Sequence, residues 1–404
     1  MPSRLRLRLS LLLFLHCAVG GAWLPVLSLY LQHNLRFSVE NIASIFALMP
    51  LASIAAPLVS GQLADRYFAL QRFLGATYLL GGVLLYLLAR QAGVEAVAAC
   101  LFGYFLLSAQ ANALSNALAF HHLPDPARNF GAVRVWGTIG WIAAGWGLTA
   151  WRRSQGVEGG TDALLFAAGL SLVLGLYCLT LPHTPPAKSA QPWAFLAAWR
   201  LLRDRNFAVF MALAFVISSQ LQYFAQISAP FLHRIGIASA DLPAVMTVAQ
   251  VSEIVAMAVL LPALLPRLGV RKCLVIGAAA WPLRCLVYAL GRPLGLVIAS
   301  LALSGISFTF FTIVAQVYVN EAASSDIKAS AQSLLVLVGS GLGSFLGAFW
   351  AGAVQGYFSM GAGAARAVNY TQVFLVPATV LTLAVLAFFL LFRDQPVARY
   401  QAKP

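Results

Sequence analysis

The sequence predicts an all-α polytopic membrane protein in which twelve transmembrane helices form two six-helix bundles. Of the 404 residues, 61% are hydrophobic and only 9% are charged, whereas about 25% of the residues of a typical soluble domain are charged. Apolar runs of about 20 residues, the length of a helix that crosses a bilayer, recur along the whole chain. One long polar connection divides these runs into two sets of six.

The predicted spans follow from the apolar runs in order. The first run continues to Tyr30, which is too long for the apolar region of a cleaved signal peptide, so we expect an uncleaved span there. The expected limits are 9–32, 40–63, 72–90, 94–120, 130–151, 162–182, 207–232, 241–265, 272–290, 293–319, 328–356 and 370–392.

The polar connection sets the predicted domain organisation. Its proline pair cannot continue a helix, and the following WAFLAAWRLL has the apolar and basic spacing of a helix lying on the membrane surface. We therefore expect an N-terminal six-helix bundle (1–182), a cytoplasmic linker with an interfacial helix (183–206), and a C-terminal six-helix bundle with a short tail (207–404).

The distribution of basic residues predicts the orientation. With both termini in the cytoplasm, most of the 26 Lys and Arg fall on cytoplasmic segments, as the positive-inside rule requires. This bias also explains the net charge of +14, so nucleic-acid binding is not expected. The five Cys show neither CxxC spacing nor paired His, and no metal site is expected. These features fit a multi-pass monomer in lipid, with both termini in the cytoplasm.

One of the 12 acidic residues, Glu253, falls near the middle of a predicted span, where an unpaired carboxylate is costly. Arg284 is its expected partner, because both lie about 20 Å along their helices from the same short cytoplasmic loop. The pair could be a static structural bridge. We favour a carboxylate that gains and loses a proton during transport, because no histidine is expected deep in a span beside a charged partner.

Polar residues recur on one face of several spans. Amides and hydroxyls in membrane helices can serve only as interhelical contacts, but several such faces together suit a neutral, hydroxylated ring compound. The residues concerned are Ser218, Ser219, Gln222 and Gln226; Gln250; and Ser304, Phe308, Thr312 and Gln316. In span eleven, Gly339, Gly343 and Gly347 follow four-residue spacing and predict a close-packing ridge.

The motif GQLADRYFALQR (61–72) follows the second span and is partly echoed by LPRLGVRK (265–272) after the eighth. Gly61 is expected at a tight helix end, Asp65 at a helix cap and Arg66 near anionic lipid. This duplicated loop, twelve spans and a long central linker resemble the major facilitator superfamily, whose two halves are related by duplication. The resemblance implies that Gly61, Asp65 and Arg66 take part in conformational change.

Further stretches resemble the bacterial nucleoside:proton symporter family of that superfamily. They are GAW (21–23), VRVWGTIGW (133–141), LTLPHTPPAK (179–188), QVSE (250–253), GISFTFF (305–311) and IKASAQ (327–332). The resemblance implies proton-coupled import of nucleosides with no cofactor beyond protons. It places Arg134 in a central cavity with Thr138 and Trp141 on the same helix face, although Arg134 lies near a span end and could instead snorkel to the surface.

The expected substrate-binding set combines these positions with the polar faces, and Glu253 and Arg284 are assigned to proton coupling. The set is Arg134, Thr138, Trp141, Gln222, Gln226, Gln250, Glu253, Ser304, Phe308 and Thr312. Three positions depart from the family: Thr309 replaces an acid, Ser304 a tyrosine and Ala225 an asparagine. Either Glu253 then works alone or the substrate differs.

Other functions remain as alternatives. The same scaffold could carry a sugar or oligosaccharide, an aromatic acid or an exported drug, although the fifth span lacks the Gly-Pro-rich motif typical of drug exporters. A membrane enzyme should cluster His, Asp, Glu or Cys near a membrane face. The nearest candidate, HHLPDPAR (121–128), is better interpreted as a cytoplasmic loop, so no enzymatic activity is expected.

Overall fold

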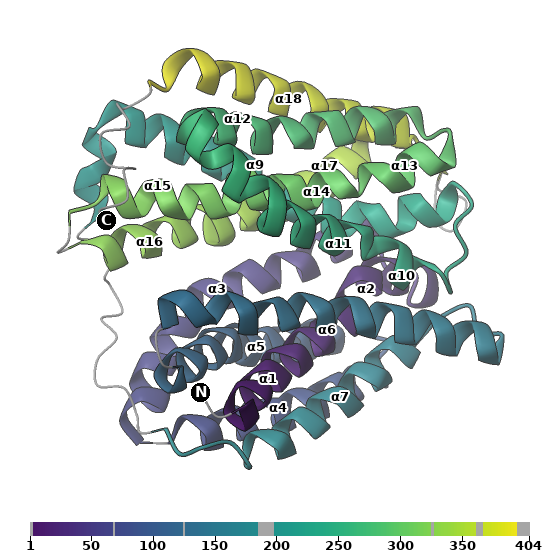
Figure 1. The fold of residues 1–404 in the computed structure, drawn as a ribbon. Helices are drawn as coiled ribbons and strands as arrows, with labels where there is room; N and C mark the ends of the chain where they lie inside the picture. The colour runs from purple at the N-terminus through teal and green to yellow at the C-terminus, as the bar shows by residue number, and fades with distance from the viewer. Residues whose placement is uncertain are drawn as a thin grey trace. The chain divides into compact units, whose positions relative to one another are not determined.

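The computed structural model describes residues 3–67, 69–123, 126–184, 198–324, 327–360 and 367–393. Almost all of these residues are helical (Figure 1). Among the described residues, nine helices are long and apolar enough to cross a membrane. Each of the twelve predicted spans falls on helical chain, and the all-α class is confirmed. Outside the helices lies a short antiparallel hairpin of β1 (Ser359–Met360) and β2 (Ala367–Val368), which the sequence analysis did not predict.

Contacts divide the chain into two compact units, 1–192 with 225–247 and 193–224 with 248–404. The first unit holds the N-terminal helices, the end of α9 and the short α10. Its elements are α1 (Ser3–Trp23), η1 (Leu24–Val26), α2 (Leu27–Leu29), η2 (Tyr30–Asn34), α3 (Val39–Tyr67), α4 (Leu70–Leu88), α5 (Val94–His122), α6 (Pro126–Gln155), α7 (Asp162–Cys178) and α10 (Leu242–Met246).

The second unit holds the remaining helices, and α9 (Arg205–Arg234) contributes residues to both units. Its other elements are η3 (Trp199–Arg203), α11 (Val248–Val255), η4 (Ala256–Leu260), α12 (Leu261–Leu290), α13 (Leu294–Ser300), α14 (Ala302–Ser307), η5 (Phe308–Ile313), α15 (Val314–Ala322), α16 (Lys328–Val336), η6 (Leu337–Gly343), α17 (Ser344–Tyr357) and α18 (Tyr370–Leu391). The first half of the predicted interfacial helix of the linker, 193–197, lies outside the described residues, and its second half falls largely on η3.

Two loop predictions had different outcomes. The cytoplasmic turn expected at 265–272 is a break within α12, where Gly269 has φ 75° and interrupts the helical backbone. A positive φ of this kind is adopted readily only by glycine. In contrast, α3 continues to Tyr67, so the expected helix end at Gly61 was wrong. The side chains of Gly61, Asp65 and Arg66 lie outside the described residues, and their roles stay a prediction.

Small residues let neighbouring helices approach closely. A Cβ atom at Gly140 of α6 would lie 2.1 Å from the carbonyl oxygen of Phe14 in α1, and one at Gly347 of α17 would lie 2.2 Å from that of Ser219 in α9. Gly339 and Gly343 also face α9. The predicted glycine ridge of span eleven is thus confirmed as a packing surface. It packs against Ser218 and Ser219, two residues of the predicted polar face on α9.

Candidate functional site

The first unit contains a cavity of about 330 Å³ between its helices. Residues of α1, α3, α4, α5, α6 and α7 line it, and the mixture of hydroxyl, amide, imidazole and aromatic groups suits a polar ring compound. Its polar and aromatic lining residues include His16, Cys17, Ser53, Thr77, Tyr78, Tyr104, Phe105, Ser108, Asn112, Arg134, Trp141 and Ser171. Among the lining residues that the structure describes, none is acidic.

Arg134 reaches this cavity because α1 and α6 pack closely. Gly137 and Gly140 present α6 to α1 without side chains, and the Arg134 guanidinium lies beside this contact, with Nη1 4.0 Å from the Sγ of Cys17. Trp141 crosses α1 at Gly21, where a Cβ would lie 2.8 Å from the Trp141 Cα. The guanidinium therefore lines the cavity. Thr138 is half-buried and is not one of the lining residues.

His16 lies beside Arg134 in this cavity, which corrects an expectation from the sequence. Its Nδ1 is 2.7 Å from the Tyr78 hydroxyl, and its side chain also hydrogen bonds to Asn112. The positive charge of Arg134 acts directly on it. The prediction that no histidine lies deep in a span near a charged partner was therefore wrong. The sequence signal was a polar residue inside the first apolar run.

The second unit holds Arg284 on α12 in an aromatic setting. The Arg284 guanidinium donates a hydrogen bond to the Tyr288 hydroxyl at 2.8 Å and another to the Ser304 hydroxyl. Its Cζ lies 4.1 Å from the centre of the Phe224 ring. The side chain is buried. Aromatic faces and hydroxyl acceptors together stabilise a guanidinium that water does not reach.

Glu253 lies on α11, close to the same part of the second unit. It is half-buried, and α14 crosses it so closely that a Cβ at Gly305 would be 2.3 Å from the Glu253 backbone nitrogen. Ser304, the neighbour of Gly305, accepts the hydrogen bond from Arg284. One turn of α14 therefore contacts both α11 at Glu253 and α12 at Arg284. A direct pair between the two charges stays a prediction.

The other predicted binding residues have different environments. Gln222 and Gln226 are both buried on α9, whereas Phe308 is 37% exposed. The Oε1 of Gln250 is buried and accepts no hydrogen bond from the described residues, so it is an acceptor that a ligand could use. The Thr309 hydroxyl, at the position of the family's acid, is likewise buried without a described partner. Ser304 and Thr312 are half-buried.

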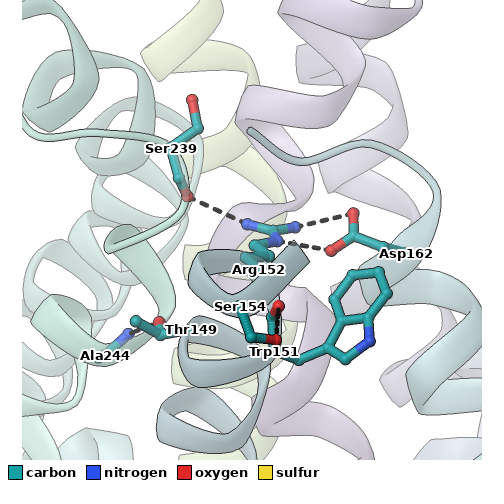
Figure 2. Close-up of polar contacts among 7 residues, drawn as sticks. All are labelled: Thr149, Trp151, Arg152, Ser154, Asp162, Ser239 and Ala244. Atoms are coloured by element: carbon teal, nitrogen blue, oxygen red, sulfur yellow. Dashed lines mark hydrogen bonds and ion pairs between the residues drawn. The ribbon is translucent and has the colours of Figure 1, made fainter. Parts of the chain in front are cut away.

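A polar network at the end of α6 was not predicted, because Arg152 and Arg153 lie just beyond the expected span 130–151. Arg152 is buried and pairs with Asp162 at 2.5 Å, with side-chain exposures of 3% and 8% (Figure 2). It also donates to the Ser239 carbonyl at 3.1 Å. Arg153 pairs with Asp241 at 2.7 Å, but this pair is largely exposed. The signal was faint, because Ser239 and Asp241 are distant in sequence from these arginines.

Two further contacts join α6 to the segment around α10. The Thr149 hydroxyl accepts a hydrogen bond from the Ala244 amide at 3.1 Å, as Figure 2 also shows. The Trp146 indole donates to the Thr247 hydroxyl at 2.9 Å. Residues 239–247 are thus held to α6 by backbone, hydroxyl and charged groups together.

Comparison with known proteins decides the family. The sequence profile of the nucleoside H⁺ symporters matches residues 3–396, almost the whole chain. The chain belongs to the nucleoside H⁺ symporter family. It is therefore a membrane transporter and not an enzyme, and the resemblance inferred from the sequence motifs is confirmed.

Individual relatives agree with this assignment. A putative nucleoside transporter of Escherichia coli, YegT, is 32% identical over 352 residues, which are 84% of this chain and 82% of that protein. The nucleoside permease NupG of Escherichia coli is 28% identical over 371 residues, 87% and 88% of the two chains. The crystal structure of NupG superposes with a TM-score of 0.86 at 26% identity and covers 98% of this chain and 100% of that one. The POT family transporter PepTSo, at 14% identity and with a TM-score of 0.73, shares the fold.

Proposed function

We propose that this chain is a symporter that imports nucleosides with protons, by alternating access, across the cytoplasmic (inner) membrane of a bacterium. Arg134 and Trp141 bind the nucleoside. Glu253 carries the proton, and Arg284 positions the helices around it. Protons are the only coupling ion, and no other cofactor takes part.

The observation that carries this proposal is the cavity of the first unit. Arg134 and Asn112 offer hydrogen-bond donors, and Trp141 offers a flat aromatic face beside them. A nucleoside has a planar base that can stack and a ribose whose hydroxyls accept and donate hydrogen bonds. Because the described part of the cavity lining holds a fixed positive charge and no acid, it favours a neutral or electron-rich ligand over a cationic one.

Glu253 is the group best suited to carry the proton. A carboxyl group can be neutral or charged near neutral pH when burial disfavours its charge, whereas arginine stays charged. The close crossing of α14 connects Glu253 to the helix that also contacts Arg284. Protonation of the carboxylate therefore changes the charge balance at a contact of three helices, which links proton binding to helix packing.

The orientation and the assembly follow from the chain itself. The excess of Lys and Arg on the segments assigned to the cytoplasm supports a location of both termini there. For the assembly, we propose a monomer surrounded by lipid. Neither nucleic acid nor a second protein is needed for the proposed activity.

A sugar is the second candidate substrate. Maltose permease of Geobacillus stearothermophilus is 28% identical over 334 residues. In addition, Thr309 stands at the position where the resemblance to the nucleoside symporters implies an acid. The two candidates share a hydroxylated ring, but only a nucleoside also has an aromatic base for Trp141.

Counterflow into proteoliposomes separates these candidates. Vesicles preloaded with unlabelled nucleoside should accumulate labelled uridine or adenosine transiently, and preloading with maltose or an aromatic acid should give no such exchange. Exchange of maltose in the absence of nucleoside exchange would contradict the nucleoside assignment and support a sugar as the substrate. Protein-free vesicles provide the background.

A further inference from the structure

His16 lines the cavity of the first unit and has no role in the proposed function above. It lies on α1, and its Nδ1 is 2.7 Å from the hydroxyl of Tyr78 on α4. That hydroxyl is also 3.1 Å from the Oγ of Ser115 on α5. Since Tyr78 and Ser115 are both buried, this chain of hydrogen bonds fixes the orientation of the imidazole ring.

The position of His16 on α1 directs it toward the cavity. Gly20 lies four residues later, so it shares a helix face with His16 about 6 Å away. A Cβ at Gly20 would be 3.1 Å from the Trp141 ring. The His16 imidazole and the Trp141 indole of α6 therefore lie next to each other along the same face of α1. A base stacked on Trp141 would place its sugar within reach of His16.

The groups around His16 determine its charge state. Arg134 faces it from α6, Tyr78 from α4, Tyr104 from α5 and Cys17 from α1 itself, and Cys178 of α7 acts on Tyr78. Among the described residues that line the cavity, Arg134 is the only one with a permanent charge. A second positive charge next to it would be repelled, which favours the neutral form of the imidazole over the charged form.

A neutral imidazole has one nitrogen that donates and one that accepts. Tyr78 engages Nδ1, and the hydroxyl of Tyr78 can serve as donor or acceptor for it. The other nitrogen is either a donor or an acceptor, according to the tautomer. Because Asn112 also hydrogen bonds to the ring, a ligand hydroxyl would share this contact or take its place. A hydroxyl group on a ligand matches both cases, since it can donate and accept. A ribose hydroxyl fits this requirement.

We propose that His16 binds a ribose hydroxyl of the nucleoside and so contributes to substrate specificity in the first unit. This inference rests on the proposed function, because it takes a nucleoside as the ligand. It assigns Tyr78 as a positioning residue that acts through the imidazole, and it makes Asn112 a neighbour of the same hydroxyl. Trp141 and Arg134 contact the ring of the base.

A double-mutant cycle between protein and ligand tests the contact. Dissociation constants of uridine, adenosine and their 2′-, 3′- and 5′-deoxy analogues are measured for the purified wild type, His16→Ala and His16→Gln. In the wild type, one deoxy analogue should bind about tenfold more weakly than its parent nucleoside, the effect of one lost hydrogen bond in a buried site. In His16→Ala, the parent should weaken by a similar factor and that analogue should lose nothing further. His16→Gln, which keeps a hydrogen-bonding group, should restore part of the difference.

His122→Gln is the matched control. His122 is a histidine of the same unit, at the end of α5, where it contacts the Thr184 hydroxyl at 2.8 Å. This variant should bind every ligand as the wild type does. A merely structural role of His16 would weaken parent and analogues equally, and that equal loss would overturn the proposal. Wild-type affinity in His16→Ala would also overturn it.

The same measurements separate this inference from the function on which it rests. If the wild type binds no nucleoside, the proposed function and this contact both fail. If the wild type binds nucleosides but all three deoxy analogues lose equal factors with and without His16, only the contact fails. Because His16→Gln is conservative, it keeps the test decisive where His16→Ala does not fold.

Discussion

Two arginines lie within predicted spans, and the structure holds them in different ways. Arg284 is fixed by Tyr288, Ser304 and the Phe224 ring. Arg134 contacts the Cys17 thiol at 4.0 Å, a weak acceptor, and its guanidinium lines a cavity. The first environment suits a positioning role, and the second leaves planar donor groups directed at a ligand.

Replacing Arg134 should therefore impair binding more than folding. We expect Arg134→Ala to reduce nucleoside uptake at least about tenfold, the effect of losing a charged hydrogen bond. Arg134→Lys should restore little, because an ammonium lacks the planar donor set. Arg153→Ala, which removes an exposed pair on the same helix, should transport normally. Near-normal uptake by Arg134→Ala, with equal amounts in the membrane, would favour an arginine that only anchors the helix.

Glu253 gives the corresponding prediction for the proton. Glu253→Gln keeps the size and hydrogen bonding of the side chain but stays permanently neutral. Uptake against a gradient should be lost and insensitive to uncouplers, while counterflow of nucleoside should persist. Both are measured in the same vesicles. Uphill, proton-driven accumulation by Glu253→Gln would show that another group carries the proton.

Charged residues in the predicted spans were easier to single out from the sequence than neutral ones. Arg134 and Glu253 were proposed as site residues because a charge inside an apolar run is costly. His16 was overlooked because its polarity is weak and its partners Tyr78 and Asn112 come from other helices. Contacts of this kind depend on tertiary packing, which hydropathy does not contain.

At the scale of helices, hydropathy located each span but not its irregularities. Four segments with wider, π-type turns interrupt the helical runs, at η2, η4, η5 and η6. The last two carry Thr309 and the start of the glycine ridge. Such local widening depends on what packs against the helix and often marks functional positions. The spacing of Gly343 and Gly347, by contrast, predicted their packing correctly, because small residues one turn apart share a face.

Substitutions at two glycines of α6 test how much the close packing of α1 on α6 contributes to stability. A Cβ at Gly140 would meet the Phe14 carbonyl oxygen at 2.1 Å, whereas nothing lies within 4 Å of a Cβ at Gly147. Gly140→Ala should lower the free energy of unfolding by about 1–3 kcal/mol, as expected for overpacking. Gly147→Ala should be neutral or slightly stabilising, because alanine favours the helix. Thermal unfolding in detergent compares them, and equal stabilities would contradict the close contact.

At the scale of the whole chain, the fold class and the family could both be inferred from sequence. Repeated apolar runs of membrane-spanning length and motifs in the right order are enough for that. The packing of residues 225–247 in the first unit could not be inferred. It depends on contacts between distant parts of the chain, such as Trp146 with Thr247 and Arg153 with Asp241. No local sequence pattern predicts those pairs.

Proton-driven accumulation is the most direct test of the central claim that this chain couples nucleoside import to protons. Purified wild-type protein is placed in proteoliposomes, an inward proton gradient is imposed, and labelled nucleoside is followed over time. Nucleoside should rise above its external concentration while the gradient lasts and fall back when an uncoupler is added. Equilibration without accumulation, at the same level with and without the gradient, would contradict the account.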